Sequence, residues 1–135
     1  MIGIVLMSHG EMAKGMYNSC TLFFGNDIPQ LEYVCLKAGE TPEEYEKRVD
    51  EAISKVDTGD GVIGMVDLLN GTPCNTCALK MNENFKVITG MNLTTLLELL
   101  GTRLSVEKLS DLDINTLVQT GKDGVKDLFD FLSHE

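Results

Sequence analysis

The sequence has little positive charge and no long apolar run. Its 135 residues hold 11 lysines and arginines against 21 aspartates and glutamates, a formal net charge of -10 at pH 7. Nucleic acids and anionic membrane surfaces bind basic patches, so neither is an expected partner, whereas a protein with a basic docking face fits this charge. No stretch reaches the roughly 18 consecutive apolar residues of a membrane span, so we expect no direct membrane insertion.

Cysteine is also scarce, with four residues in the chain. No basic leader precedes the short apolar run at the N-terminus, so we expect no secretory signal. Without one, the four thiols are expected to be reduced in a cytoplasmic protein. No low-complexity segment, repeat or linker interrupts the sequence. Its length suits a single domain, which we predict over residues 1–135.

Four short apolar segments alternate with segments of helical spacing. Strands are predicted at residues 1–7, 31–36, 62–66 and 85–89, and helices at 11–24, 42–56, 72–81, 93–100 and 114–132. This alternation predicts an α/β fold with a doubly wound, mainly parallel four-stranded sheet and helices on both faces. In flavodoxin-like winding the first and third strands are neighbours. The pattern of 101–113 fits either a short helix or an irregular crossing.

Two ionisable residues directly follow the first and third strands. If these strands are neighbours, His9 and Asp67 meet at the carboxyl edge, where ligands of open α/β sheets bind. A carboxylate on one ring nitrogen fixes the tautomer and leaves the other nitrogen open, which suits phosphoryl acceptance or general-base work. We predict no metal site, since the other histidine, His134, lies almost at the C-terminus. The alternative is a histidine that caps a helix or binds a backbone carbonyl.

The segment Asn70-Gly71-Thr72-Pro73 has the residues of a helix start. We expect Gly71 to permit a tight turn and Thr72 to be the N-cap, with Pro73 in the first turn. Amide groups at such a helix end bind anions, so Gly71 and Thr72 are predicted to hold phosphate. In isolation, ordinary capping explains the same residues. No nucleotide-binding glycine motif is present, and we predict no cofactor.

Further residues are expected around this crevice. Ser8, Gly10 and Asn70 flank the predicted site residues and are expected to line it. Asn92 either caps the helix that follows the fourth strand or lines the crevice.

A C-x-x-C pair, Cys74 and Cys77, lies at the start of the third predicted helix. Thiol pKa values fall at helix starts, so a dithiol redox site is one interpretation. The other cysteines do not have zinc-site spacing. We favour two packed helix residues over the redox interpretation.

Three of these motifs together resemble the IIA component of the mannose-type sugar phosphotransferase system. The resemblance rests on residues 4–10, on Val66-Asp67 with 70–73, and on 87–92. The family pattern is a strand ending in [ST]-H-G, then V-D-x-x-G-G-[ST]-P, then G-x-N, and it covers essentially the whole chain. Asn70 replaces the first glycine of the second motif, and asparagine tolerates left-handed backbone geometry.

This resemblance implies a phosphotransferase that acts as a phosphocarrier without metal or nucleotide. His9 would accept a phosphoryl group from phosphohistidine on HPr and pass it to a IIB protein, coupled to a membrane sugar permease. Asp67 would orient the ring, while amides near Gly71 and Thr72, with the Thr72 hydroxyl, would hold phosphate oxygens. Such proteins are typically homodimers with a C-terminal segment at the interface, which would also explain the irregular pattern of 101–113.

Two other functions compete with this one. The first is a non-enzymatic regulatory module that senses an anion at Gly71 and Thr72, which needs neither His9 nor Asp67. The second is a phosphoryl donor for a dihydroxyacetone kinase, ranked lower because the second motif of that branch differs from the one here. Since no hinge or IIB sequence follows, a free-standing IIA protein is expected.

Overall fold

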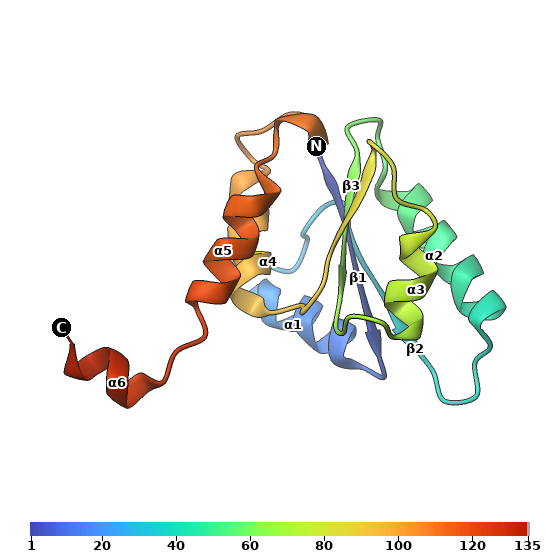
Figure 1. Ribbon diagram of the computed structural model, residues 1–135. Coiled ribbons are helices and arrows are strands. Elements are labelled where there is room, and N and C mark those ends of the chain that lie inside the picture. The colour runs from blue at the N-terminus through green and yellow to red at the C-terminus, as the bar shows by residue number, and fades with distance from the viewer. Residues whose placement is uncertain (135) are drawn as a thin grey trace.

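A four-stranded parallel sheet forms the centre of the computed structural model, which describes residues 1–134 (Figure 1). The strands are β1 (Gly3–His9), β2 (Leu31–Leu36), β3 (Val62–Val66) and β4 (Phe85–Ile88). Their order is β2-β1-β3-β4, and all three pairings are parallel. The predicted doubly wound sheet, with the first and third strands side by side, is confirmed.

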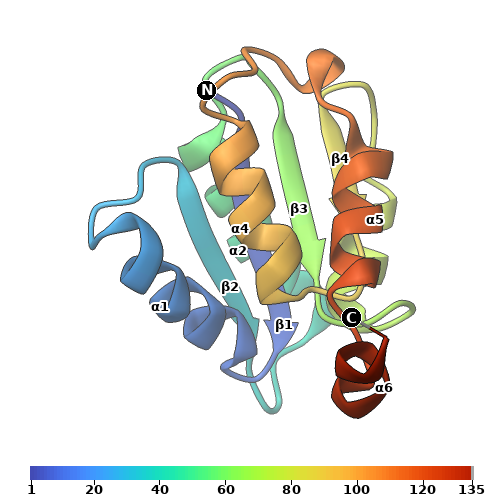
Figure 2. The same cartoon turned by 90° about the vertical axis from the view of Figure 1, so that its left-hand side faces the viewer.

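Helices cover both faces of this sheet (Figures 1 and 2). One face carries α1 (Met12–Phe24), α4 (Leu93–Thr102) and α5 (Ile114–Asp123), and the other carries α2 (Pro42–Val56) and α3 (Thr72–Ala78). A last short helix, α6 (Leu128–Ser133), extends away from the sheet. Within residues 1–134, no helix combines the length and apolar character that crossing a bilayer requires.

The apolar run of β1 reflects burial on both faces. Ile4 and Leu6 join the core cluster beneath α1 and α4, whereas Val5 and Met7 join the cluster beneath α2 and α3. All four side chains are fully buried. A strand covered on both sides therefore has no polar alternation, and the first polar residues mark where β1 leaves the core.

The start of α2 follows the predicted capping pattern. The Thr41 hydroxyl accepts a hydrogen bond from the Glu44 amide at 3.1 Å, and Pro42 occupies the first turn. Tyr45 then crosses to the sheet and donates its hydroxyl to the carbonyl oxygen of Val34 at 2.8 Å. The cap thus fixes the N-terminal end of α2 beside the carboxyl edge of the sheet.

Two predicted helices are wrong in extent. The helix predicted at 114–132 is interrupted, because α5 ends before Gly124 and α6 begins with a new cap, in which Asp127 accepts from the Asp130 amide at 3.2 Å. Local capping here overrides the apolar periodicity. The helix predicted at 72–81 ends at Ala78.

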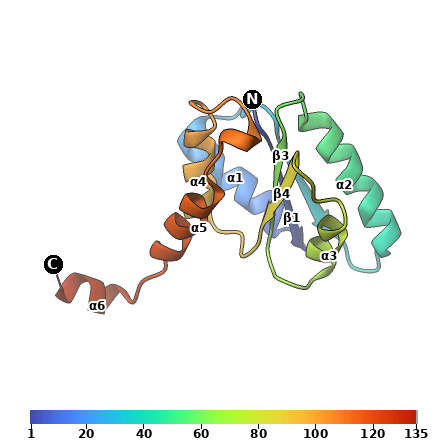
Figure 3. The same cartoon turned by 45° about the horizontal axis from the view of Figure 1, so that its top comes forward.

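The irregular segment between α4 and α5 crosses the amino edge of the sheet (Figure 3). It contains a single 3-10 turn, Leu109–Asp111, and it buries Leu109 and Leu112. The Leu109 amide donates to the Asp60 carbonyl oxygen at 2.8 Å. Its irregular pattern therefore reflects packing within the chain, and the contribution expected from a dimer interface stays a prediction.

Candidate functional site

His9 and Asp67 meet at the carboxyl edge of the sheet. The paired strands end side by side, with Met7 opposite Val66, so each site residue leaves the sheet at the same level. Asp67 Oδ2 lies 2.9 Å from His9 Nδ1 and also accepts a hydrogen bond from the His9 backbone amide at 2.8 Å. One carboxylate oxygen therefore holds both the backbone and the ring of His9.

Burial and hydrogen bonding have opposite effects on the pKa of the Asp67 carboxyl. Its side chain is only 7% exposed, and burial alone raises a carboxyl pKa. Against this, Oδ2 accepts from the His9 amide and interacts with the His9 ring, while Oδ1 accepts from the Leu68 amide at 2.9 Å. These bonds outweigh burial, so the pKa of Asp67 is lowered and the carboxylate is ionised at neutral pH.

The His9 ring leaves one nitrogen open. Its side chain is 45% exposed, and Nδ1 is engaged by the carboxylate. A proton held on Nδ1 by an anion leaves the lone pair on Nε2. Such a ring can act as a nucleophile or as a general base through Nε2, and the fixed negative charge stabilises the ring when it becomes cationic.

Gly71 lies directly against this ring. A Cβ atom added at Gly71 would fall 2.5 Å from His9 Cε1 and 3.2 Å from Nε2. The chain does turn here, at residues 69–70, but the left-handed residue of the turn is Asn70 (φ 71°), whereas the backbone of Gly71 is extended (φ -89°). Glycine is needed at 71 because the ring occupies the space of a side chain.

The start of α3 also differs from its predicted form. Gly71, not Thr72, is the N-cap of α3, and no side chain caps this helix. Thr72 is the first residue of α3 and Pro73 the second, so the missing amide of Pro73 costs no helical hydrogen bond. The Thr72 hydroxyl is therefore not committed to capping beside the His9 ring.

Ser8 and Gly10 shape the turn that presents His9. The buried Ser8 hydroxyl donates to the Gly10 carbonyl oxygen at 3.0 Å and accepts from the Ala13 amide at 2.7 Å. Gly10 has a positive φ of 58°, which lets the chain leave β1 and enter α1. Both residues stabilise the turn that follows His9, and the Ser8 hydroxyl also accepts from an otherwise unpaired amide at the start of α1.

Asn92 is occupied at the start of α4. Its side chain accepts from the Thr95 amide at 2.8 Å and donates to the Gly90 carbonyl oxygen at 3.0 Å. Of the two roles expected for Asn92, these contacts fit the cap. A role in lining the crevice stays a prediction.

The thiol of Cys77 is poorly suited to redox chemistry. Its side chain is fully buried, and burial raises the pKa of Cys77 to about 12. Its sulfur lies 3.1 Å from the Met7 sulfur, and both Cys74 and Cys77 are free thiols. Reactive thiols have lowered pKa values, so these contacts favour the packing interpretation.

No cluster of three or more histidine, cysteine, aspartate or glutamate side chains suited to a metal ion occurs within the described residues. The carboxyl edge brings together one imidazole, one carboxylate and the start of α3. Sequence reasoning found the first two from topology. It missed the steric role of Gly71 and the hydrogen bond from the Leu68 amide to Asp67 Oδ1. Both depend on the path of the loop that follows β3.

The fold and the site together define a class: a flavodoxin-like domain that presents a histidine–aspartate pair at its topological switch point. Residues 3–117 match the family model EIIA-man, described as the PTS system fructose IIA component. The chain belongs to this family of phosphotransferase system components.

Characterised proteins of two bacteria are similar to this chain. It is 29% identical over 129 residues to the PTS system mannose-specific EIIAB component of Escherichia coli (strain K12), covering 94% of this chain and 39% of that protein. The chain thus spans about two fifths of the length of this relative. It is 26% identical over 105 residues to the PTS system fructose-specific EIIA component of Bacillus subtilis (strain 168), covering 76% and 71% of the two chains.

Solved structures share the fold. The phosphotransferase system component EIIA from Streptococcus agalactiae superposes with a TM-score of 0.83 at 23% identity, covering 95% of this chain and 98% of that one. The mannose/sorbose specific IIA subunit from Enterococcus faecalis superposes with a TM-score of 0.80 at 24% identity, covering 93% and 92%. The predicted α/β architecture is that of these EIIA structures.

Proposed function

We propose that this chain is a phosphohistidine carrier that accepts a phosphoryl group from phospho-HPr on His9 and passes it to a IIB protein. The observation that carries the proposal is the contact of His9 Nδ1 with the ionised Asp67 carboxylate at 2.9 Å, which leaves Nε2 as the open ring nitrogen. Membership of the EIIA-man family supports the same reaction. In this proposal residues 1–135 act as one IIA domain in the cytoplasm, coupled to sugar uptake and phosphorylation.

The transfer needs no cofactor to balance. The Nε2 lone pair of His9 attacks the phosphorus of phospho-HPr, and a new N–P bond forms. The N–P bond to HPr breaks, and its electron pair returns to the imidazole of HPr. The Nδ1 proton of His9 stays on its hydrogen bond to Asp67, whose negative charge offsets the cationic character of the phosphorylated ring. Transfer to a IIB protein repeats these steps with His9 as the donor.

The start of α3 supplies the groups that would receive the phosphate oxygens. Gly71 lies against the ring beside Nε2, and the uncommitted Thr72 hydroxyl follows it. Positioning and charge stabilisation account for most of the catalysis of phosphoryl transfer, because little covalent chemistry is left to the protein. We therefore assign phosphate binding to Gly71 and Thr72, with Asn70 setting the loop that carries them.

Intact-mass spectrometry at neutral pH tests this proposal. The protein is incubated with phosphoenolpyruvate, the general phosphotransferase enzyme and HPr. We expect the wild type to gain one acid-labile phosphoryl group and the His9→Ala variant to gain none. A wild type that stays unmodified while HPr is phosphorylated, or a His9→Ala variant that is still modified, would overturn the proposal.

The second proposal concerns assembly as a homodimer through the C-terminal segment. No residue of α6 is buried, and this segment exposes five large apolar side chains, Val125, Leu128, Phe129, Phe131 and Leu132. Apolar groups gathered on one exposed segment mark a protein contact. We expect light scattering to give the mass of a dimer for the wild type and of a monomer for a Phe129→Ser, Leu132→Ser variant. A monomeric wild type would contradict this assembly.

A further inference from the structure

A groove begins at the proposed phosphate site and runs between α2 and α3. Its volume is about 280 Å³, and its lining comes from both helices: Pro42, Glu43, Glu46, Thr72, Asn75, Thr76 and Leu79. Thr72 belongs to the groove and to the start of α3 that faces His9. A molecule that approaches His9 over α3 therefore meets this groove.

The lining combines two carboxylates with polar and aliphatic groups. Glu43 and Glu46 are exposed on α2, and Leu79, 91% exposed, stands at the end of α3. Glu46 lies 3.4 Å from Lys80 Nζ, but the shorter contact of Lys80, 2.8 Å, is to Asp50. Within the described residues Glu43 forms no ion pair. The α2 side of the groove is therefore acidic. The α3 side is lined by the polar residues Thr72, Asn75 and Thr76, and aliphatic surface comes from Pro42 and Leu79.

We infer that this groove seats a lysine or arginine side chain of the protein that donates the phosphoryl group to His9. The inference rests on the proposed function. A long basic side chain has an aliphatic stem, which fits against Pro42 and Leu79. Its charged head fits the carboxylates of Glu43 and Glu46. The net charge of -10 also favours a basic docking face on the partner. Because Thr72 joins the groove to the site, a partner held here places its own reactive group near His9.

The test compares a protein donor with a small donor. Phosphoramidate phosphorylates imidazoles directly and needs no docking surface, whereas phospho-HPr must bind before transfer. The test variant is Glu43→Gln, Glu46→Gln, which keeps the shape of the groove and removes its charge. The matched control is Glu51→Gln, another exposed glutamate of α2 that is not part of the groove. The rate of His9 phosphorylation is measured with each donor at low and at high salt.

We expect the groove variant to raise the KM for phospho-HPr by roughly three- to tenfold at low salt, because rim charges act mainly on encounter and their effect is screened by salt. The rate with phosphoramidate should equal that of the wild type, which also shows that the variant folds. Glu51→Gln should match the wild type with both donors.

Three results would overturn the inference, and they are distinguishable. If the wild type accepts phosphate from both donors and the groove variant has the KM of the Glu51→Gln control, the groove does not bind the donor while the carrier function stands. If neither donor phosphorylates His9 of the wild type, the proposed function fails and the inference fails with it. A slower transfer to the IIB protein alone would assign the groove to the acceptor and contradict the donor assignment.

Discussion

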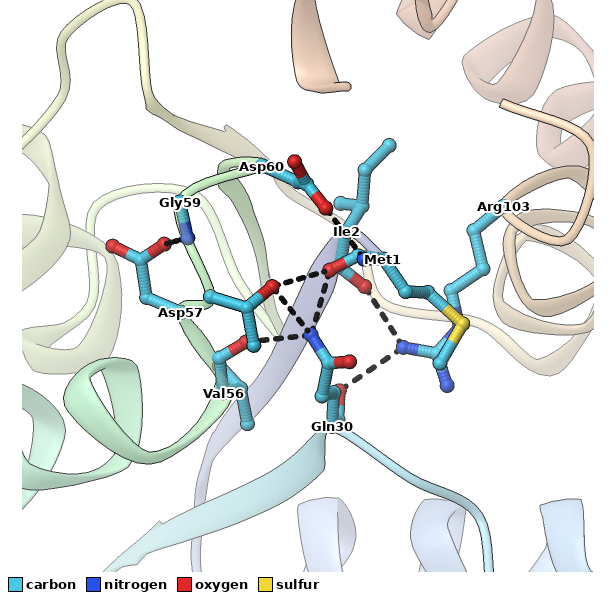
Figure 4. Close-up of polar contacts among 9 residues, drawn as sticks. Met1, Ile2, Gln30, Val56, Asp57, Gly59, Asp60 and Arg103 are labelled. Carbon is cyan, nitrogen blue, oxygen red and sulfur yellow. Dashed lines mark hydrogen bonds and ion pairs between the residues drawn. The ribbon is translucent and has the colours of Figure 1, made fainter. Parts of the chain in front are cut away.

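Each edge of the sheet has a buried charged side chain, and the two differ in the groups that surround the charge. At the carboxyl edge the Asp67 carboxylate, 7% exposed, lies beneath an imidazole that is 45% exposed. At the amino edge Arg103, 3% exposed, donates to the carbonyl oxygens of Ile2 and Gln30 (Figure 4) and to that of Pro29, and within the described residues its hydrogen bonds all go to carbonyl oxygens. A charge surrounded by backbone oxygens joins chain segments together, whereas a charge beneath an open ring changes how that ring reacts.

The two edges also differ in the role of a residue with a strained backbone. Within the described residues two non-glycine residues have a positive φ, Gln30 at 50° on the amino edge and Asn70 at 71° on the carboxyl edge. The Gln30 side chain donates to the carbonyl oxygens of Met1 and Val56, at 2.6 Å and 2.9 Å (Figure 4). Asn70 instead leads into Gly71 against the His9 ring. At the amino edge, hydrogen bonds of the Gln30 side chain offset the strain and connect separate chain segments. At the carboxyl edge, the strained Asn70 positions the loop that carries Gly71.

The largest expected effect comes from adding one carbon at the carboxyl edge. In Gly71→Ala the new Cβ would fall 2.5 Å from His9 Cε1, so the ring must move from its place beside Asp67. We expect the rate of phosphoryl transfer to fall about 100-fold, as misplacement by about 1 Å can cause. The midpoint of thermal unfolding should stay near that of the wild type, because the displaced ring is half exposed.

The matched control is Gly15→Ala in α1, where an added Cβ meets nothing within 4 Å. It should stabilise the protein by about 0.5–1 kcal/mol and leave transfer unchanged, since alanine is the better helix former. A Gly71→Ala variant with the wild-type transfer rate would show that the close approach to the ring has no role.

A substitution at the amino edge should lower stability and leave phosphoryl transfer unchanged. Arg103→Met removes the donors to three carbonyl oxygens, so we expect the free energy of unfolding to fall by about 2 kcal/mol. Part of this loss is recovered, because burial disfavours the charged guanidinium and lowers the pKa of Arg103 to about 10. Phosphoryl transfer by the folded protein should not change. Denaturant unfolding and intact-mass rates measure the two quantities.

Leu104→Ser is the control for this variant, because Leu104 adjoins Arg103 and is 72% exposed. Its unfolding free energy should lie within about 0.5 kcal/mol of the wild type. If Arg103→Met abolished transfer while the protein stayed folded, the separation between a structural edge and a reactive edge would be wrong.

The smallest expected effect is the pH dependence of stability from Asp67. The pKa of this carboxyl is lower in the folded protein than the value of about 3.9 for an unfolded chain. Its stabilising contribution is therefore complete above that unfolded value and is lost as the pH falls through the folded pKa.

Asp67→Asn should have a lower free energy of unfolding than the wild type at neutral pH. Below about pH 4 the difference between the two free energies should shrink, because the Asp67 carboxyl of the wild type becomes protonated. Asp27→Asn, an exposed residue away from the site, is the control and should show no convergence. A constant difference between Asp67→Asn and the wild type across this range would contradict the assignment.

The sequence was sufficient to predict the sheet and the pair it brings together. Apolar runs buried on both faces identify β1 and β3, and flavodoxin-like winding then places His9 and Asp67 at one edge. The inference needs only the end of each strand, which the change from apolar to polar residues marks clearly. It does not need the path of the loops.

What depends on loop paths was not predictable. The space around Gly71 is set by the His9 ring, which comes from a strand about sixty residues earlier. Arg103 has no local pattern that marks it as buried, because its acceptors lie on segments far from it in sequence. The interruption after α5 is set by the Asp127 cap, which apolar periodicity does not register.

Histidine-selective ¹⁵N labelling with NMR of the phosphorylated protein tests the central claim most directly. The chain has two histidines, so His9 and His134 can be followed separately, and His134 is an internal control. We predict phosphorylation of His9 at Nε2, with the Nδ1 proton retained on its hydrogen bond to Asp67 and His134 unmodified. Phosphate on Nδ1 of His9, or on His134, would contradict the role given to the histidine–aspartate pair.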